Sequence, residues 1–157
     1  MELTTILERI EKQNLILPDF QRGFVWEQER MRKLYASVLA KIPIGSILTL
    51  ESPDEKFNCK QIGAKPRTRI LPKPSKTVDY LIDGQQRITS LLAGFSKYYF
   101  ENFYKNESDI ASNDLLSLYF LKIPAIDNSE SDDIFGAREL KFKKRSFSSS
   151  EMYSIID

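Results

Sequence analysis

The stretch YLIDGQQRITSLLAG, residues 80–94, contains the sharpest change of pattern in the chain. An apolar run typical of a buried strand ends at Asp83, and apolar residues then recur at helical spacing from Ile88 onward. Gly84 stands at the junction, where it permits the backbone torsions of a tight strand-to-helix turn. The stretch therefore predicts a strand, a sharp turn and a helix in immediate succession.

The residues of this turn could hold an anion. The first N–H groups of a helix are free, and the helix dipole favours negative charge there. Gln85 and Gln86 add neutral donors, Arg87 adds a guanidinium suited to bidentate phosphate contact, and Asp83 could hold Mg²⁺ through one carboxylate. The simpler alternative is structural: Asp83 caps the helix, Gly84 shapes the turn, and Arg87 is solvated or ion-paired.

A second run, LPDFQRGFVW at residues 17–26, places ring faces beside hydrogen-bonding groups. A nucleobase site uses this mixture, with Gln21 and Arg22 supplying the polar contacts. The alternative is that Phe20, Phe24 and Trp26 are core anchors, as aromatic residues usually are.

Outward from these two runs, periodicity and turn residues indicate a chain of alternating elements. Apolar residues recur at helical spacing from Leu3 onward, and Thr5 with Glu8 fits a capping box, which together predict the first helix. The predicted elements, in order, are a helix ending near Asn14, a helix over residues 27–41, strands at 45–51 and 78–82, a helix after Gly84 with a possible extension through 97–104, a strand at 116–123, a polar loop at 128–137, and a fourth strand at 139–145.

Residues 53–76 contain four of the seven prolines and seven basic residues, six of these from Lys60 onward, and no acid after Glu55. This predicts a long loop or loose hairpin outside the core. Lys60, Lys65, Arg67 and Arg69 could follow a nucleic-acid backbone, because clustered Lys and Arg release condensed counterions. A solvated connection is the alternative, and KFKKR at residues 141–145 has the same two interpretations.

Composition sets limits on the chemistry. The chain has 157 residues, 41% of them hydrophobic, which suffices for one domain with a core. Its net charge of +1 gives no bulk attraction to DNA. There is no histidine and only one cysteine, Cys59, which excludes His-based nucleophile pairs and His- or Cys-rich metal sites. With no signal peptide and no membrane-length apolar run, a cytoplasmic setting is expected.

The last residues begin a pattern that the chain does not complete. Ser148 and Glu151 form a second capping-box pattern before EMYSIID. We therefore expect a single domain over residues 1–157 that is the N-terminal piece of a longer protein.

LPDFQRGFVW, then IPIGSILTLE, then YLIDGQQRITSLLAG resemble, in order and approximate spacing, the N-terminal domain of the GmrSD-type modification-dependent restriction systems. The likeness covers residues 3–94 and is weaker beyond. It implies the ParB/sulfiredoxin-like fold, an α+β architecture with a small mixed sheet flanked by helices. Members of that fold bind nucleotides at a Gly-x-x-Arg turn, which here is Gly84, Gln85, Gln86 and Arg87.

Two branches of the fold fit less well. Sulfiredoxins need a cysteine where this chain has Gln85, and Cys59 lies elsewhere. The chromosome-partition clamps carry Glu and Arg inside the turn and then a helix-turn-helix domain, which this sequence does not show. The basic segment between the two strands is also longer than the family pattern requires.

The resemblance implies binding and hydrolysis of a nucleoside triphosphate with Mg²⁺, controlling DNA cleavage by an HNH-type nuclease module placed downstream or in a partner chain. Gly84 to Arg87 would cradle the phosphates, with Asp83 and Arg87 catalytic and Gln21 and Arg22 closing the site. The expected enzyme is a nucleoside triphosphatase without nuclease activity. Two alternatives stay open: a non-catalytic module that binds DNA or a partner and uses DGQQR as a structural turn, and a partition-type clamp with nucleotide as a switch.

Overall fold

The computed structural model describes residues 2–52, 57–64, 77–96, 117–121 and 135–139, together with Tyr99, Ser112 and Leu115. Within these residues no helix is long and apolar enough to cross a membrane. The elements are, in order, α1 (Leu3–Glu11), β1 (Leu15–Pro18), α2 (Gln28–Leu39), β2 (Leu48–Ser52), β3 (Cys59–Lys60), β4 (Val78–Asp83), α3 (Gln85–Phe95), β5 (Ser117–Leu121) and β6 (Phe135–Glu139).

Four strands form one mixed sheet in the order β2-β4-β1-β3. The two central strands, β1 and β4, run parallel, and the outer strands are each antiparallel to their neighbour. β5 and β6 make a separate antiparallel pair. Helices with a small mixed sheet confirm the predicted α+β class, while the closer likeness to the ParB/sulfiredoxin-like fold stays a prediction.

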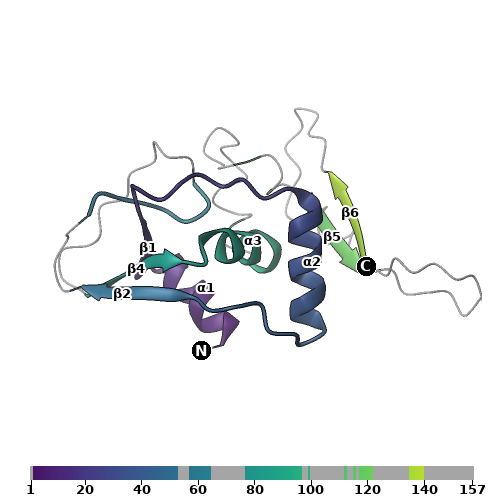
Figure 1. Ribbon diagram of the computed structural model, residues 1–157, viewed down its shortest axis with the longest axis horizontal. Helices are drawn as coiled ribbons and strands as arrows, with labels where there is room; N and C mark the ends of the chain where they lie inside the picture. Colours follow the sequence, from purple (N-terminus) through teal and green to yellow (C-terminus); the bar gives the residue numbers. More distant parts are fainter. Residues whose placement is uncertain are drawn as a thin grey trace, which may run out of the picture.

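The helices set where the β4–α3 turn lies. Figure 1 shows α3 continuing from the end of β4, with α2 standing across α3 and the β5–β6 pair on the far side of α2. Tyr35 of α2 donates its hydroxyl to the Ser90 carbonyl oxygen of α3 at 2.7 Å, and its ring contacts Phe95 and Tyr119 edge-on. The turn is thus fixed between the sheet and a helix pair.

The central strands are buried on both faces, as parallel strands usually are. Leu15, Leu17 and Leu81 face a main core shared with all three helices, whereas Ile16 and Tyr80 belong to a second cluster on the opposite face. Residues of α3 enter the main core on one side of that helix: Ile88, Leu91 and Leu92 are at most 1% exposed. Burying each such side chain contributes about 1.5–3 kcal/mol, which is enough to hold the start of α3 in place.

The helix ends differ from the prediction in two places. α1 begins at Leu3 with Glu2 as its N-cap, so the predicted capping box of Thr5 and Glu8 is wrong. Leu3 packs against the core, and the helix therefore starts one turn earlier than polar capping alone would place it. α3 does not continue beyond Phe95, because Ser96 is extended and its hydroxyl accepts the Tyr99 N–H at 3.3 Å, as an N-cap residue does.

The segment predicted to be a loop outside the core is partly core. Cys59 and Lys60 form β3, which pairs with β1, and Ile62 and Ala64 are buried in the main cluster. This pairing joins residues far apart in the sequence, so local composition did not reveal it. Residues 53–56 and 65–76, including the predicted DNA contacts Lys65, Arg67 and Arg69, lie outside the described residues.

The second antiparallel pair begins earlier than predicted. β6 spans Phe135–Glu139, so it includes the end of the predicted polar loop and only the first residue of the predicted fourth strand. Its register with β5 runs from Leu121 opposite Phe135 to Ser117 opposite Glu139. The bounds of β6 are therefore set by its pairing with β5, and not by the charge pattern of KFKKR. The capping pattern of Ser148 and Glu151 lies outside the described residues.

Candidate functional site

The β4–α3 turn has the geometry that a glycine permits. Gly84 is the N-cap of α3 with φ +95°, and no side chain caps the helix. The first intrahelical bond runs from the Ile88 N–H to the Gly84 carbonyl oxygen, so the N–H groups of the first turn have no intrahelical acceptor. The interpretation of Asp83 as the helix cap is therefore wrong, because the αL glycine takes the cap position itself.

A pocket of about 250 Å³ opens at this turn. It joins the two runs singled out in the sequence, although they are some sixty residues apart. Its lining residues are Gln21, Arg22, Trp26, Asp83, Gly84, Gln85, Gln86 and Arg87. Every residue predicted to bind the nucleotide lines this one pocket, and so does Asp83, predicted to hold metal.

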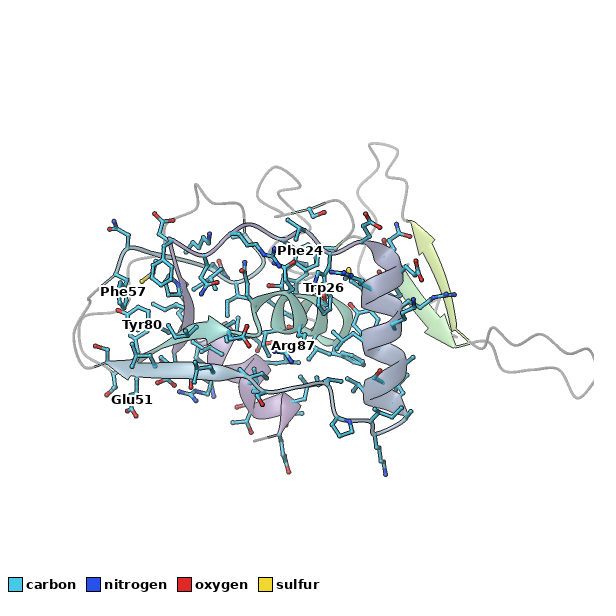
Figure 2. All side chains as sticks on the ribbon, in the orientation of Figure 1. Phe24, Trp26, Glu51, Phe57, Tyr80 and Arg87 are labelled. Atoms are coloured by element: carbon cyan, nitrogen blue, oxygen red, sulfur yellow. The ribbon has the colours of Figure 1, made fainter. Side chains whose placement is uncertain are left out.

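The three aromatic residues of the first run separate in the fold. Phe24 is buried in the main core, which confirms the core interpretation for that ring. Trp26 packs partly against the core and also lines the pocket. Phe20 is 67% exposed and contacts Phe57 edge-on, so it is not a core anchor. In Figure 2 Phe24 and Trp26 lie above α3, and Phe57 lies beside Tyr80.

Residues 19–26, here called the strap, cross the start of α3. Two glutamine side chains attach it. Gln85 Nε2 donates to the Arg22 carbonyl oxygen at 2.7 Å, and Gln86 Nε2 donates to the Gly23 carbonyl oxygen at 3.0 Å. Gln86 Oε1 accepts the N–H groups of the strap residues Val25 and Trp26, at 2.8 and 3.2 Å. These amides, predicted as phosphate donors, bind backbone.

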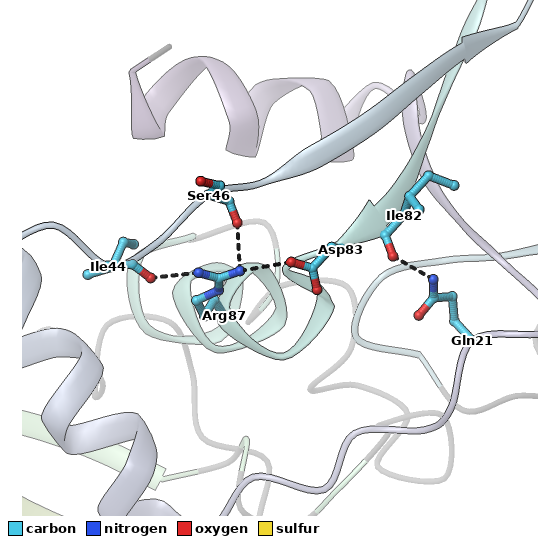
Figure 3. A network of polar contacts seen from close by, with 6 residues as sticks. All are labelled: Gln21, Ile44, Ser46, Ile82, Asp83 and Arg87. Carbon is cyan, nitrogen blue, oxygen red and sulfur yellow. Dashed lines mark hydrogen bonds and ion pairs between the residues drawn. The ribbon is translucent and has the colours of Figure 1, made fainter.

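The other end of the strap is attached to the sheet. Gln21 Nε2 donates to the Ile82 carbonyl oxygen at 2.8 Å (Figure 3). Lys60 Nζ donates to the carbonyl oxygens of Gln21 and Asp19. Lys60 is only 3% exposed, so the prediction that it follows a nucleic-acid backbone is wrong. Its register opposite Leu17 directs its side chain to the strap.

Arg87 lies against the turn that precedes β2. Its Nη1 donates to the Ile44 carbonyl oxygen at 2.7 Å and its Nη2 to the Ser46 carbonyl oxygen at 2.6 Å, with Asp83 Oδ2 3.4 Å from Nη2 (Figure 3). The Arg87 side chain is 19% exposed, against 71% for that of Asp83. Arg87 is therefore neither solvated nor simply ion-paired: it holds the 44–46 turn.

Gly45 makes this contact possible, and sequence reasoning missed it. Its φ is +94°, and a Cβ placed there would lie 2.0 Å from Arg87 Nη1. The available signal was a glycine directly after IPI and before an apolar strand. That signal predicts a turn but does not reveal the arginine that fills it.

The charged side chains that line the pocket differ in how many partners they contact. Arg22 is exposed, and its guanidinium has no hydrogen-bond or ion-pair partner within the described part of the chain. Arg87 has five N–H groups, of which three contact Ile44, Ser46 and Asp83. Asp83 is the carboxylate of the lining, and the described residues contain no group of three or more residues that could hold a metal ion without a ligand's help.

Comparison with known proteins gives a family. The sequence profile described as "GmrSD restriction endonuclease, N-terminal domain" matches residues 3–156. An uncharacterized protein of Methanocaldococcus jannaschii is 32% identical over 103 residues, which are 64% of this chain and 17% of that protein's length. No solved structure matches this chain significantly. Because the profile covers almost the whole chain, the chain belongs to the family of N-terminal domains of GmrSD restriction endonucleases.

Proposed function

We propose that the pocket binds the phosphates of a nucleoside triphosphate and that the domain hydrolyses it to control a nuclease module of a phage-defence restriction protein. The observation that carries the proposal is the convergence of both sequence motifs on one pocket at an uncapped helix start. The volume of about 250 Å³ is below the ~300–1,000 Å³ of typical ligand sites, which suits a polyphosphate better than a whole nucleotide.

The division of roles follows from which groups are free. The uncapped N–H groups of α3 meet the phosphate oxygens, and Gly84 allows them to approach. Arg22 supplies an unengaged guanidinium, and Arg87 supplies the N–H groups that Ile44, Ser46 and Asp83 leave over. Both cations offset charge that develops during phosphoryl transfer to water.

Mg²⁺ fits this pocket only if the phosphate oxygens of a bound nucleotide join the Asp83 carboxylate as its ligands. Asp83 gives one exposed carboxylate, and nucleotide-bound Mg²⁺ is usually held by one or two carboxylates, phosphate oxygens and water. When bound, the ion would neutralise phosphate charge. Asp83 itself would orient the ion or the attacking water.

The test is calorimetric titration of the chain with the β,γ-imido analogues of ATP and GTP in the presence of Mg²⁺, followed by a phosphate-release assay with ATP and GTP. Saturable binding and release of phosphate are expected. If neither analogue binds, the proposed nucleotide site is refuted.

One observation favours a second function. The side chains of Gln85, Gln86 and Arg87 all bind backbone, as they would if DGQQR were a structural turn of a non-catalytic module that binds DNA or a partner. Binding of an analogue without phosphate release would support a switch of the partition-clamp type. Absence of both would support the binding module.

A further inference from the structure

We propose that Gln85 and Gln86 are positioning residues. They hold the strap so that the Arg22 side chain faces the proposed phosphate site at the start of α3, and Arg22 is the phosphate contact through which they act. The inference rests on the proposed function and assigns the amides a role different from direct phosphate binding.

The side-chain amides of Gln85 and Gln86 are already engaged by the strap. Gln86 has four hydrogen-bonding positions, and three contact the strap at Gly23, Val25 and Trp26. Both glutamines are 8% exposed. Turning either amide toward a phosphate would leave partly buried backbone groups of the strap without these partners, which costs free energy.

The attachments of the strap lie at Arg22 and on both sides of it. Gln21 is tied to Ile82, the Arg22 carbonyl oxygen accepts from Gln85, and the next carbonyl oxygen, at Gly23, accepts from Gln86. The backbone of Arg22 is thus fixed on both sides while its side chain stays exposed at the pocket. A long cationic side chain can reach only the space that its backbone position allows, so these bonds select its target.

Trp26 provides a fluorescent reporter of the strap. Trp26 is the only tryptophan of the chain, it lines the pocket, and its backbone N–H donates to Gln86 Oε1. Its fluorescence therefore reports the position of the strap without any nucleotide, and it reports pocket occupancy when nucleotide is present.

The experiment is a double-mutant cycle on the full chain with the β,γ-imido analogues of ATP and GTP and Mg²⁺. The single variants are Gln85→Met and Arg22→Ala, with Gln28→Met as the matched control on α2, outside the pocket. We expect Arg22→Ala to weaken binding about 10- to 100-fold and Gln85→Met about three- to tenfold. Gln28→Met should change affinity less than twofold.

The double variant decides between the two roles. If Gln85 acts through Arg22, adding Gln85→Met to Arg22→Ala causes less than a twofold further loss. If the two losses multiply, Gln85 contacts the phosphate independently and the proposal is wrong. Circular dichroism and the melting temperature confirm that each variant is folded.

A measurement without nucleotide separates this inference from the proposed function. Gln86→Met should shift the Trp26 emission and increase its quenching by iodide, whereas Gln28→Met should do neither. Unchanged emission and quenching in Gln86→Met would overturn the attachment of the strap, even if nucleotide binds. Failure of the unmodified chain to bind either analogue would instead overturn the proposed function and, with it, the role given to Arg22.

Discussion

At the scale of single residues, the contact between Arg87 and Gly45 decides how the pocket is built. The guanidinium occupies space that only a glycine leaves open, and its two terminal nitrogens bind the carbonyl oxygens on either side of that glycine. The position of Arg87 after Gly84 in the sequence identifies it as a site residue. It could not identify the acceptors, because they lie some forty residues away.

Gly45→Ala should therefore destabilise the fold. An L-residue in the left-handed region costs about 1–2 kcal/mol, and the new Cβ would also displace the guanidinium. Urea unfolding measures the loss. Gly23→Ala is the matched control, since a Cβ at Gly23 would have no atom within 4 Å, and it should change the unfolding free energy by less than ~0.5 kcal/mol. Equal stability of the two variants would contradict the contact.

Arg87→Ala should weaken binding of the triphosphate analogue by about 1.5–3 kcal/mol, the range for a hydrogen bond to a charged group. Arg87→Lys should recover only part, because an ammonium cannot reproduce the planar fork that spans Ile44 and Ser46. Calorimetry gives the affinity and circular dichroism confirms folding. A folded Arg87→Ala variant with unchanged affinity would leave Arg87 as a structural residue of the 44–46 turn.

At the scale of elements, the sequence predicts what is local and misses what is paired across the fold. α2, β4 and the turn into α3 come from periodicity, proline and glycine within a few residues, and they were predicted almost to the residue. β3 and β6 were missed or displaced, because their existence depends on pairing with β1 and β5. For the same reason the residues of the pocket were predicted, but the attachment of the glutamines to the strap was not.

The buried side chain of Lys60 on β3 leads to a prediction about the hydrogen bonds that attach the strap to the sheet. Lys60→Met removes the donor to the carbonyl oxygens of Gln21 and Asp19, and should lower the unfolding free energy by about 1–3 kcal/mol. It should also shift the Trp26 emission. Lys33→Met, at an exposed ion pair on α2, should cost less than ~0.5 kcal/mol and leave the emission unchanged. A shift in neither variant would show that Lys60 does not hold the strap.

The contact between Tyr35 of α2 and Ser90 of α3 leads to a prediction of how the stability of the fold depends on pH. Burial raises the pKa of Tyr35 well above its ordinary value of 10.0, and burial also raises the pKa of Tyr99. Above about pH 10 the unfolded chain therefore loses these protons first, and each tyrosine lowers stability by roughly 1.4 kcal/mol per pH unit. Below that pH the contribution is constant.

Urea unfolding of the unmodified chain and of Tyr35→Phe from pH 9 to pH 11 measures this effect. The variant loses the hydroxyl that donates to Ser90, which should cost about 0.5–1.5 kcal/mol at pH 9. Its stability should then fall less steeply with pH than that of the unmodified chain. Parallel curves would mean that Tyr35 ionises as easily in the folded state as in the unfolded one.

At the scale of the whole molecule, the family places the chain among N-terminal domains of restriction endonucleases, and the fold places its candidate site at the start of α3. The matched region spans 17% of the length of the Methanocaldococcus relative. Any activity of a longer protein is therefore only proposed for this domain. The described fold leaves the pocket open at one end of the sheet, where the strap and the 44–46 turn meet α3. A ligand that contacts Arg22 and Arg87 together would therefore contact the strap and the residue that holds the 44–46 turn.

DNA binding is the prediction that belongs to this scale, because a net charge of +1 gives the molecule no long-range attraction for DNA. Any affinity must come from a local cluster, and the sequence predicts Lys65, Arg67 and Arg69. If each neutralises one phosphate, replacing all three with Ala should reduce the slope of log K against log salt by about 2.7, since each phosphate contact contributes about 0.9. Fluorescence anisotropy with a labelled duplex at several salt concentrations measures the slope.

The matched control removes three positive charges from exposed positions, at Lys12 just after α1 and at Arg30 and Lys33 on α2. Its net charge equals that of the first triple variant, so a general charge effect would change both slopes equally. We expect the control to keep the slope of the unmodified chain, because Lys12 and Lys33 are already paired with Glu8 and Glu29, each four residues earlier in the chain. Equal slopes in all three proteins, or no binding at low salt, would show that the basic segment does not contact DNA, and the partner of the domain would then have to be sought among proteins.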